Sequence, residues 1–137
     1  MKTYTLTVPM KIVGKARPRV VRNYGRVHVF TPDATAAAEQ AIRIEALRCG
    51  VRPADGPVSV SLEVFHAAPK SFNRVQRGKA LAGELLPTRK PDLDNVIKLV
   101  LDALNGRAWN DDSQVTDIAA RRIYAEHEGL VIKVAHK

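Results

Sequence analysis

The chain has 137 residues, of which 45% are hydrophobic and 26% charged, and it carries a formal net charge of +8. This length provides for one hydrophobic core, so we expect a single domain over residues 1–137. No apolar run approaches the ~20 residues of a membrane span, and the N-terminus alternates polar and apolar residues, unlike a secretory signal. We therefore expect a cytoplasmic protein that does not enter a membrane.

Positive charge is concentrated in two stretches of the chain. Residues 11–26 hold six cations and no acid, and residues 70–90 hold six more against the single acid Glu84. Clustered lysines and arginines gain affinity for nucleic acids by releasing counterions, although such runs also serve as solubilising surface charge. Two runs together with an acidic cluster favour nucleic acid. The DNA-binding candidates are Lys15, Arg17, Arg19, Lys70, Arg74, Arg77, Lys79, Arg89 and Lys90.

The first half of the chain predicts two strands and a helix. Residues 3–8 alternate threonine with apolar side chains, which is typical of a half-buried strand. Glycine and proline interrupt regular structure in residues 14–19, which should form a loop that displays cations. A short strand over residues 26–30 precedes a helix over residues 34–49, and Gly50 is placed to end that helix.

The second half predicts further strands and helices. Residues 58–64 alternate as a second half-buried strand, and a short basic helix capped by its first residue follows over residues 71–81. The most strongly amphipathic helix covers residues 93–104. Residues 116–125 and 130–135 then alternate as an antiparallel pair of strands. This order predicts an α+β domain, a mixed β-sheet with helices packed largely on one face.

Acidic residues gather in one stretch of this basic protein, residues 90–115, which reads KPDLDNVIKLVLDALNGRAWNDDSQV. Its apolar residues recur at the i, i+3, i+4 spacing of a helix that ends before Gly106. Asp92 falls at the N-cap of this helix, Asp94 in its first turn, and Lys98 one turn later beside Asp94. Each position also has an ordinary explanation, because aspartates cap helices, suit the helix dipole and pair with lysines four residues on.

Asp111 and Asp112 follow the helix after a short connection, and capping does not account for them. If they return to Asp92 and Asp94, three or four carboxylates repel one another unless a cation neutralises them. Oxygen ligands without paired cysteine or histidine suit Mg²⁺ or Mn²⁺ and argue against zinc. A hard metal among phosphate-binding loops predicts phosphodiester hydrolysis, with Lys98 offsetting charge in the transition state or positioning the nucleophile.

A specific pattern runs through this stretch. It comprises Pro91-Asp92-Leu93-Asp94-Asn95, then Lys98, Asp102-Ala103-Leu104, Trp109 and Asp111-Asp112-Ser113-Gln114-Val115. The pattern closely resembles the signature of the RusA family of Holliday-junction resolvases, in the version found in many phage-borne relatives. The resemblance implies a RusA-like endonuclease domain.

The resemblance also implies an activity. It implies a Mg²⁺-dependent endodeoxyribonuclease, with Mn²⁺ as a substitute, that acts as a homodimer in a bacterial or phage-infected cell. Such an enzyme resolves Holliday junctions by paired nicks in opposed strands during DNA recombination and repair. Carried over by motif, the metal-binding and catalytic carboxylates are Asp92, Asp94 and Asp112, and Lys98 is the essential lysine. Asp111 matches the acidic residue before the last ligand and is a further candidate.

One segment departs from the family pattern. Where the best-known members carry an Asn-rich Pro-Ser-x-Asn segment, this chain has Gly14-Lys15-Ala16-Arg17-Pro18-Arg19. The departure leaves open the preference for junctions over other branched DNA and any sequence preference. Two alternatives therefore stand beside junction resolution. One is a structure-specific nuclease that acts on flaps or forks, and the other is a non-catalytic DNA-binding accessory protein whose acidic cluster holds a structural cation.

Overall fold

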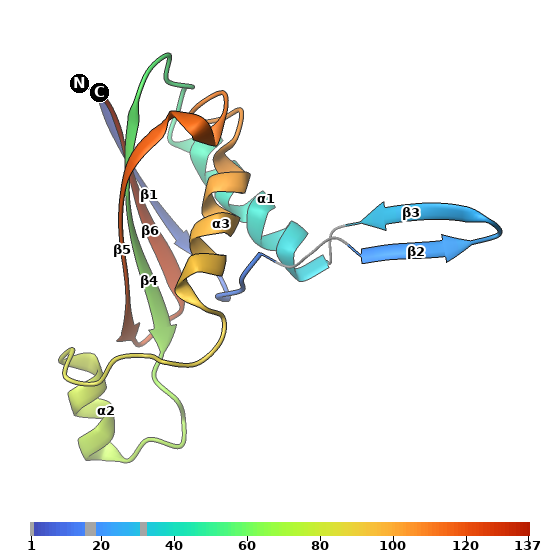
Figure 1. The fold of residues 1–137 in the computed structure, drawn as a ribbon. Helices are drawn as coiled ribbons and strands as arrows, with labels where there is room; N and C mark the ends of the chain where they lie inside the picture. Colours follow the sequence, from blue (N-terminus) through green and yellow to red (C-terminus); the bar gives the residue numbers. More distant parts are fainter. Residues whose placement is uncertain (1, 16–18, 31–32) are drawn as a thin grey trace.

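A four-stranded sheet with two helices on one of its faces forms the body of the molecule (Figure 1). The computed structural model describes residues 2–15, 19–30 and 33–137. The strands are β1 (Lys2–Pro9), β2 (Arg19–Asn23), β3 (Arg26–Phe30), β4 (Val58–Ala67), β5 (Val115–Ala125) and β6 (Gly129–His136). The helices are α1 (Asp33–Arg48), α2 (Arg74–Leu81), α3 (Leu93–Leu104) and the short 3-10 helix η1 (Asp112–Gln114).

The sheet is mixed, in the order β1-β6-β4-β5. β6 runs antiparallel to both β1 and β4, whereas β5 runs parallel to β4. The expected mixed sheet of an α+β domain is thus confirmed, but the prediction that the last two strands pair with each other is wrong. Because β4 lies between β5 and β6, Val64 faces Arg122 on one side and Leu130 on the other. Alternation identifies a strand without identifying its partner.

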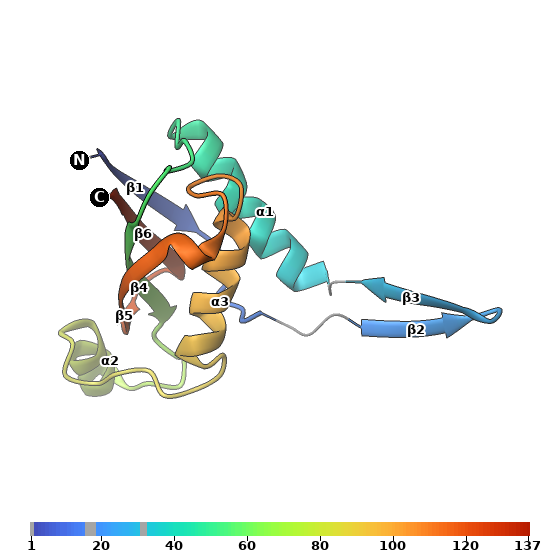
Figure 2. The same cartoon turned by 45° about the horizontal axis from the view of Figure 1, so that its top comes forward.

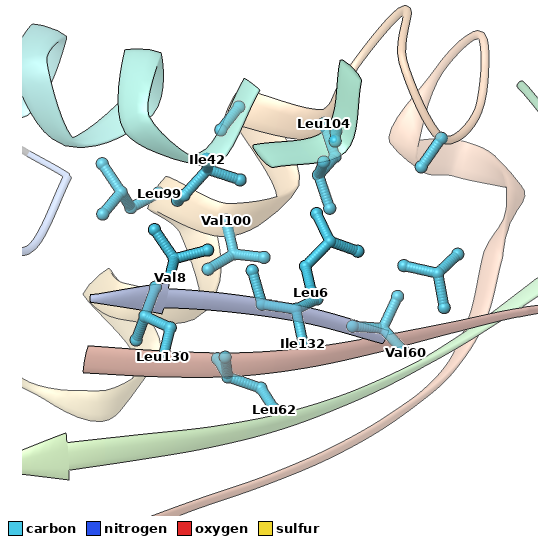
Figure 3. Packing of buried hydrophobic residues seen from close by; sticks show 14 of the residues in the cluster. Leu6, Val8, Ile42, Val60, Leu62, Leu99, Val100, Leu104, Leu130 and Ile132 are labelled. Carbon is cyan, nitrogen blue, oxygen red and sulfur yellow. The ribbon is translucent and has the colours of Figure 1, made fainter. Parts of the chain in front are cut away.

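The core lies between the sheet and the helices α1 and α3 (Figure 3). Every second residue of β4 from Val58 to Val64 is buried, as the alternation of the sequence predicts. α3 contributes Leu99, which is fully buried beside the predicted apolar positions. Trp109 just beyond α3 is also fully buried, with its indole nitrogen donating to Asn105 at 2.7 Å. This packing gives α3 a rigid backing.

A two-stranded hairpin of β2 and β3 extends away from the body of the molecule, as two views show (Figures 1 and 2). The turn at its tip has positive φ angles at Tyr24 (51°) and Gly25 (74°), as two-residue hairpin turns require. The sequence predicted β3 but treated the residues up to Arg19 as a loop, so β2 and the hairpin were missed. Residues 16–18 of that predicted loop lie outside the described residues.

The helix ends follow local rules with one correction. α2 is capped by Asn73, whose side chain accepts from the backbone N–H of Gln76 at 2.8 Å. The side chain of Gln76 in turn accepts from the backbone N–H of Asn73 at 2.9 Å. This reciprocal capping box displaces the predicted cap at Ser71. Gly50 and Gly106 follow α1 and α3 with φ of 70° and 78°, in the left-handed region expected beyond a helix. No helix in the described part of the chain is long and apolar enough to cross a membrane.

Candidate active site at the start of the third helix

Asp92 occupies the N-cap position of α3 without capping it. Its backbone is extended (φ −65°, ψ 149°), but its side chain accepts no hydrogen bond from the first turn. The carboxylate is 48% exposed and forms an ion pair with Lys90 at 2.9 Å. The ordinary explanation by helix capping therefore fails for this residue, and the carboxylate oxygens remain accessible to a ligand.

Asp94 and Lys98 lie one turn apart on the exposed side of α3. Within the described residues, no ion pair joins these two side chains, although their spacing allows one. Both charged groups face solvent, while Val96 between them and Leu99 after Lys98 are buried. The start of α3 thus presents two carboxylates and one ammonium on a firmly packed helix.

Residues 14 and 15 pack against the first turn of α3. The backbone N–H of Lys15 donates to the carbonyl of Asn95 at 3.1 Å. A Cβ atom at Gly14 would lie 2.9 Å from the Cβ of Asn95 and 3.1 Å from that of Pro91, so only glycine allows this close approach. Pro91 and Asn95 bracket the two aspartates, and this contact restricts their backbone.

The side chain of Lys15 has a structural role that the sequence did not indicate. Its ammonium group bonds Glu39 of α1 and lies 3.4 Å from Asp102 of α3, with 18% of the side chain exposed. Burial opposes the charged form, but the hydrogen bond and negative charge of Glu39, together with Asp102, raise the pKa of Lys15. Arg43 bonds the other oxygen of Glu39 at 3.2 Å. Lys15 therefore joins the two helices.

Asp111 and Asp112 lie at η1, which precedes β5. The side chain of Asp111 accepts from the backbone N–H of Ser113 at 3.1 Å and caps η1. Hydrogen bonding by the side chain of Ser113, and then by its backbone, lowers the pKa of Asp111. Asp112 is half-buried in the first position of η1. Gln114 fixes η1 by donating to the carbonyls of Ala54 and Gly56 at 2.8 and 3.0 Å. Asp111 thus has a capping role, whereas Asp112 has none.

Asp92 and Asp94 lie at the start of α3, whereas the segment that holds Asp111 and Asp112 follows the other end of that helix and leads into β5 (Figure 1). η1 leads into Val115, which pairs with Val58 at the beginning of β4, whereas Asp92 lies near Arg122, which pairs with Val64 towards the end of β4. The 12 residues of α3 span ~18 Å between the pairs. Among the described residues, no three histidine, cysteine or acidic side chains are grouped closely enough to hold a metal.

The predicted DNA-binding residues have different surroundings. Arg17 lies outside the described residues, and only the backbone of Arg19 is described. Arg89 is exposed but donates to the carbonyl of Ala67 at 3.1 Å. The remaining candidates, all exposed, are Lys70, Arg74, Arg77, Lys79 and Lys90.

The hairpin adds cations that were counted in the first basic stretch but not named as candidates. Arg22 and Arg26 are exposed near its tip, and the side chain of Tyr24 between them is 97% exposed. The exposure of these residues depends on a hairpin that the sequence did not reveal.

Arg122 of β5, which the sequence did not single out, contacts the segment that leads into Asp92. Its guanidinium group donates to the carbonyls of Pro87, Arg89 and Pro91, the last at 2.6 Å. Arg121 and Arg122 interrupt the apolar alternation of β5, and this irregularity was the available signal. The position of Arg122 next to Asp92 could not be predicted otherwise, because it depends on the pairing of β5 with β4.

Comparisons with known proteins agree with the pattern of residues. The model of the endodeoxyribonuclease RusA family matches residues 9–135. The chain is also 34% identical over 139 aligned positions to the uncharacterized protein YqaN of Bacillus subtilis (strain 168), covering 98% of this chain and 96% of that protein. The match includes α3, the two pairs of aspartates and the strands β4 and β5. The chain belongs to the RusA endodeoxyribonuclease family.

Proposed function

We propose that this protein is a Mg²⁺-dependent, dimeric endonuclease that resolves four-way DNA junctions by paired nicks in opposed strands. The observation that carries the proposal is the start of α3, where Asp92 does not cap its helix and Asp94 and Lys98 remain exposed. Three charged side chains without a local structural partner in the helix are available for a ligand, and family membership supports DNA as the substrate.

The donor set at this site fits a hard metal. Asp92 and Asp94 offer carboxylate oxygens, and these are the ligands that Mg²⁺ and Mn²⁺ prefer. A bound Mg²⁺ supplies Lewis-acid polarisation of a phosphate and a more acidic water. Lys98, one turn further along α3, is placed to bind a phosphate oxygen and to offset negative charge as it develops. Lys90 holds Asp92 by its ion pair until a ligand arrives.

Asp112 would contribute to the metal site of a second subunit. Because ~18 Å of helix separates it from Asp92, and Mg²⁺ ligands lie ~2 Å from the ion, one chain cannot direct both carboxylates to the same metal. A two-fold axis near the middle of α3 would place two copies of the helix antiparallel. Asp92 and Asp94 of one subunit would then meet Asp112 of its partner, giving two equivalent sites.

The exposed cations supply the DNA contacts in this proposal. The residues around α2, namely Lys70, Arg74, Arg77 and Lys79, form one group, and Arg22 and Arg26 of the hairpin form another. Both groups would bind phosphates and add to the salt dependence of binding. Lys15 is excluded from the contacts proposed, because its ammonium group is committed to Glu39 and Asp102.

A panel of DNA substrates tests the proposal. With Mg²⁺, purified protein should place paired nicks in a synthetic four-way junction and leave duplex and single-stranded DNA largely uncut. Asp94→Asn should bind the junction but cut it at least ~10²-fold more slowly, and Lys98→Ala should show a similar loss with binding retained. Glu126→Gln, which removes an exposed acid in the turn between β5 and β6, should cut like the parent.

Three results would change the assignment. Preferred cleavage of flaps or forks would replace junction resolution by a nuclease for other branched DNA. Binding without cleavage of any substrate, together with a metal-dependent melting temperature, would make the protein a DNA-binding accessory factor. Normal cleavage by Asp94→Asn would remove the start of α3 as the active site.

A further inference from the structure

The segment that leads into Asp92 is held by a single guanidinium group. Arg122 forms four hydrogen bonds, to the carbonyl of Pro87 (3.2 and 2.9 Å), to that of Arg89 (2.9 Å) and to that of Pro91 (2.6 Å). These carbonyls belong to alternate residues of one stretch, so one planar fork spans all of it. The last carbonyl belongs to the peptide bond with Asp92.

β5 places this guanidinium group on the helix-bearing side of the sheet. Arg122 is opposite the buried residue Val64, whereas its neighbour Arg121 lies opposite Glu63 and forms an ion pair with it. Arg121 is exposed, and Arg122 is half-buried. Two consecutive arginines therefore lie on different faces of the sheet, and four N–H groups of Arg122 donate to backbone carbonyls.

The start of α3 is held from a second direction by residues 14 and 15. Gly14 contacts Pro91 and Asn95, and the N–H of Lys15 donates to the carbonyl of Asn95. The backbone from Pro91 to Asn95 thus lies between this loop and the Arg122 guanidinium. Asp92 has no cap bond of its own, so these two contacts act on the backbone on either side of it, in addition to the ion pair of its side chain with Lys90.

We propose that Arg122 is a positioning residue that fixes the backbone before Asp92 and thereby sets the affinity of the metal site. It acts through the carbonyls of residues 87, 89 and 91, and it touches neither metal nor DNA. The inference rests on the proposed function, since it assumes that Asp92 is a metal ligand. Groups that orient the ligands of a metal typically change its affinity by ~10–100-fold when they are removed.

Metal titration of the purified protein without DNA tests this role. Arg122→Met keeps the length of the side chain and removes every donor, and it should weaken Mn²⁺ binding by about 10-fold or more. Arg122→Lys retains the charge but not the fork, so it should lie between the parent and Arg122→Met. The matched control is Arg121→Met, which removes the neighbouring guanidinium on the other face and should bind Mn²⁺ like the parent.

Two further measurements separate positioning from general damage to the fold. In metal-free protein, amide hydrogen exchange over residues 92–96 should be faster in Arg122→Met, while the amides of β1 and β6 keep their protection. In cleavage assays, a higher Mg²⁺ concentration should restore the rate of Arg122→Met with junction affinity unchanged, but it should not restore Asp92→Asn.

The outcomes distinguish this inference from the proposed function. If the parent binds Mn²⁺ and cuts DNA, and Arg122→Met and Arg122→Lys both keep its metal affinity, the positioning role is refuted while the function stands. Should Arg122→Met fail to fold, normal Mn²⁺ affinity and normal exchange in Arg122→Lys would equally refute it. If the parent binds no metal, the proposed function fails and the positioning role fails with it.

Discussion

His66 lies in β4 with 1% of its surface exposed, and its Nε2 atom has no hydrogen-bond partner among the residues that the structure describes. Burial, and then the positive charges of Arg122 and Arg89, lower the pKa of His66 from 6.5 to about 4. The imidazole therefore stays neutral in the folded protein at pH values where it would be protonated in the unfolded chain.

This difference makes stability depend on pH. Between pH 6.5 and about 4 the unfolded chain binds a proton at His66 that the folded protein does not bind, so stability falls as the pH is lowered through this range. We expect the melting temperature of the parent to fall by roughly 5 °C more than that of His66→Leu between pH 7 and pH 4.5. Carboxylates titrate in both proteins, so the variant serves as the control.

Circular dichroism melts of the two proteins at both pH values provide the measurement. Equal decreases in the melting temperature would show that His66 is not buried as a neutral group. A larger decrease in His66→Leu would reverse the sign of the linkage and contradict the account.

The sequence predicted the positions of some single residues but not the contacts of others. The positions of Asp92 and Asp94 at the start of α3 follow from the apolar periodicity of that helix, and they are confirmed. The role of Lys15 could not be predicted, because the carboxylate that it bonds lies 24 residues away, on α1. Arg122 was missed for the same physical reason, since its partners lie more than 30 residues earlier in the chain.

At the scale of elements, the hairpin of β2 and β3 is the segment most separated from the core. Arg22, Arg26 and Tyr24 are exposed on it, together with Val20 (66%) and Val27 (55%). The hairpin extends from the side of the molecule that carries α1 and the start of α3 (Figure 2). Cations on an extended arm suit phosphate binding, and an exposed ring at a tip suits stacking on an unpaired base.

Removing the two hairpin cations should weaken DNA binding without changing the fold. For Arg22→Gln with Arg26→Gln, we expect the slope of log K against log salt to decrease by up to about two units. The melting temperature should stay unchanged, because neither side chain is buried. The matched control is Lys2→Gln with Arg52→Gln, which removes two exposed cations elsewhere and should retain the salt dependence of the parent. Equal slopes in all three proteins would show that the hairpin does not contact phosphates.

Local patterns predicted most of the elements, whereas their pairing required information from the whole chain. The amphipathic periodicity of α3 and the alternation of β4 reflect one buried face each, so both elements are confirmed. The pairing of β5 with β4 instead of β6 results from a parallel arrangement of strands far apart in sequence. The hairpin lacks a buried face, so its short strands left only a weak signal.

At the scale of the whole molecule, the distribution of the aspartates has the largest consequence. The sequence indicated that Asp111 and Asp112 follow α3, but a return to Asp92 and Asp94 depended on topology. In the folded chain the length of α3 separates the two pairs, and Asp102 between them forms an ion pair with Lys15. In the function proposed above, each subunit would contribute two halves of a metal site from opposite ends of one helix, and two subunits would form two complete sites.

Mixing two inactive variants tests this central claim most directly. Asp94→Asn and Asp112→Asn should each fail to cut a four-way junction. A heterodimer of the two has one site with both changes and one intact site, formed by Asp94 of the Asp112→Asn subunit and Asp112 of the Asp94→Asn subunit. After subunit exchange, an equal mixture should therefore recover roughly a quarter of the parent's sites and make single nicks instead of paired ones. If the mixture stays inactive although heterodimers form, or if Asp112→Asn alone cuts like the parent, the shared site is contradicted.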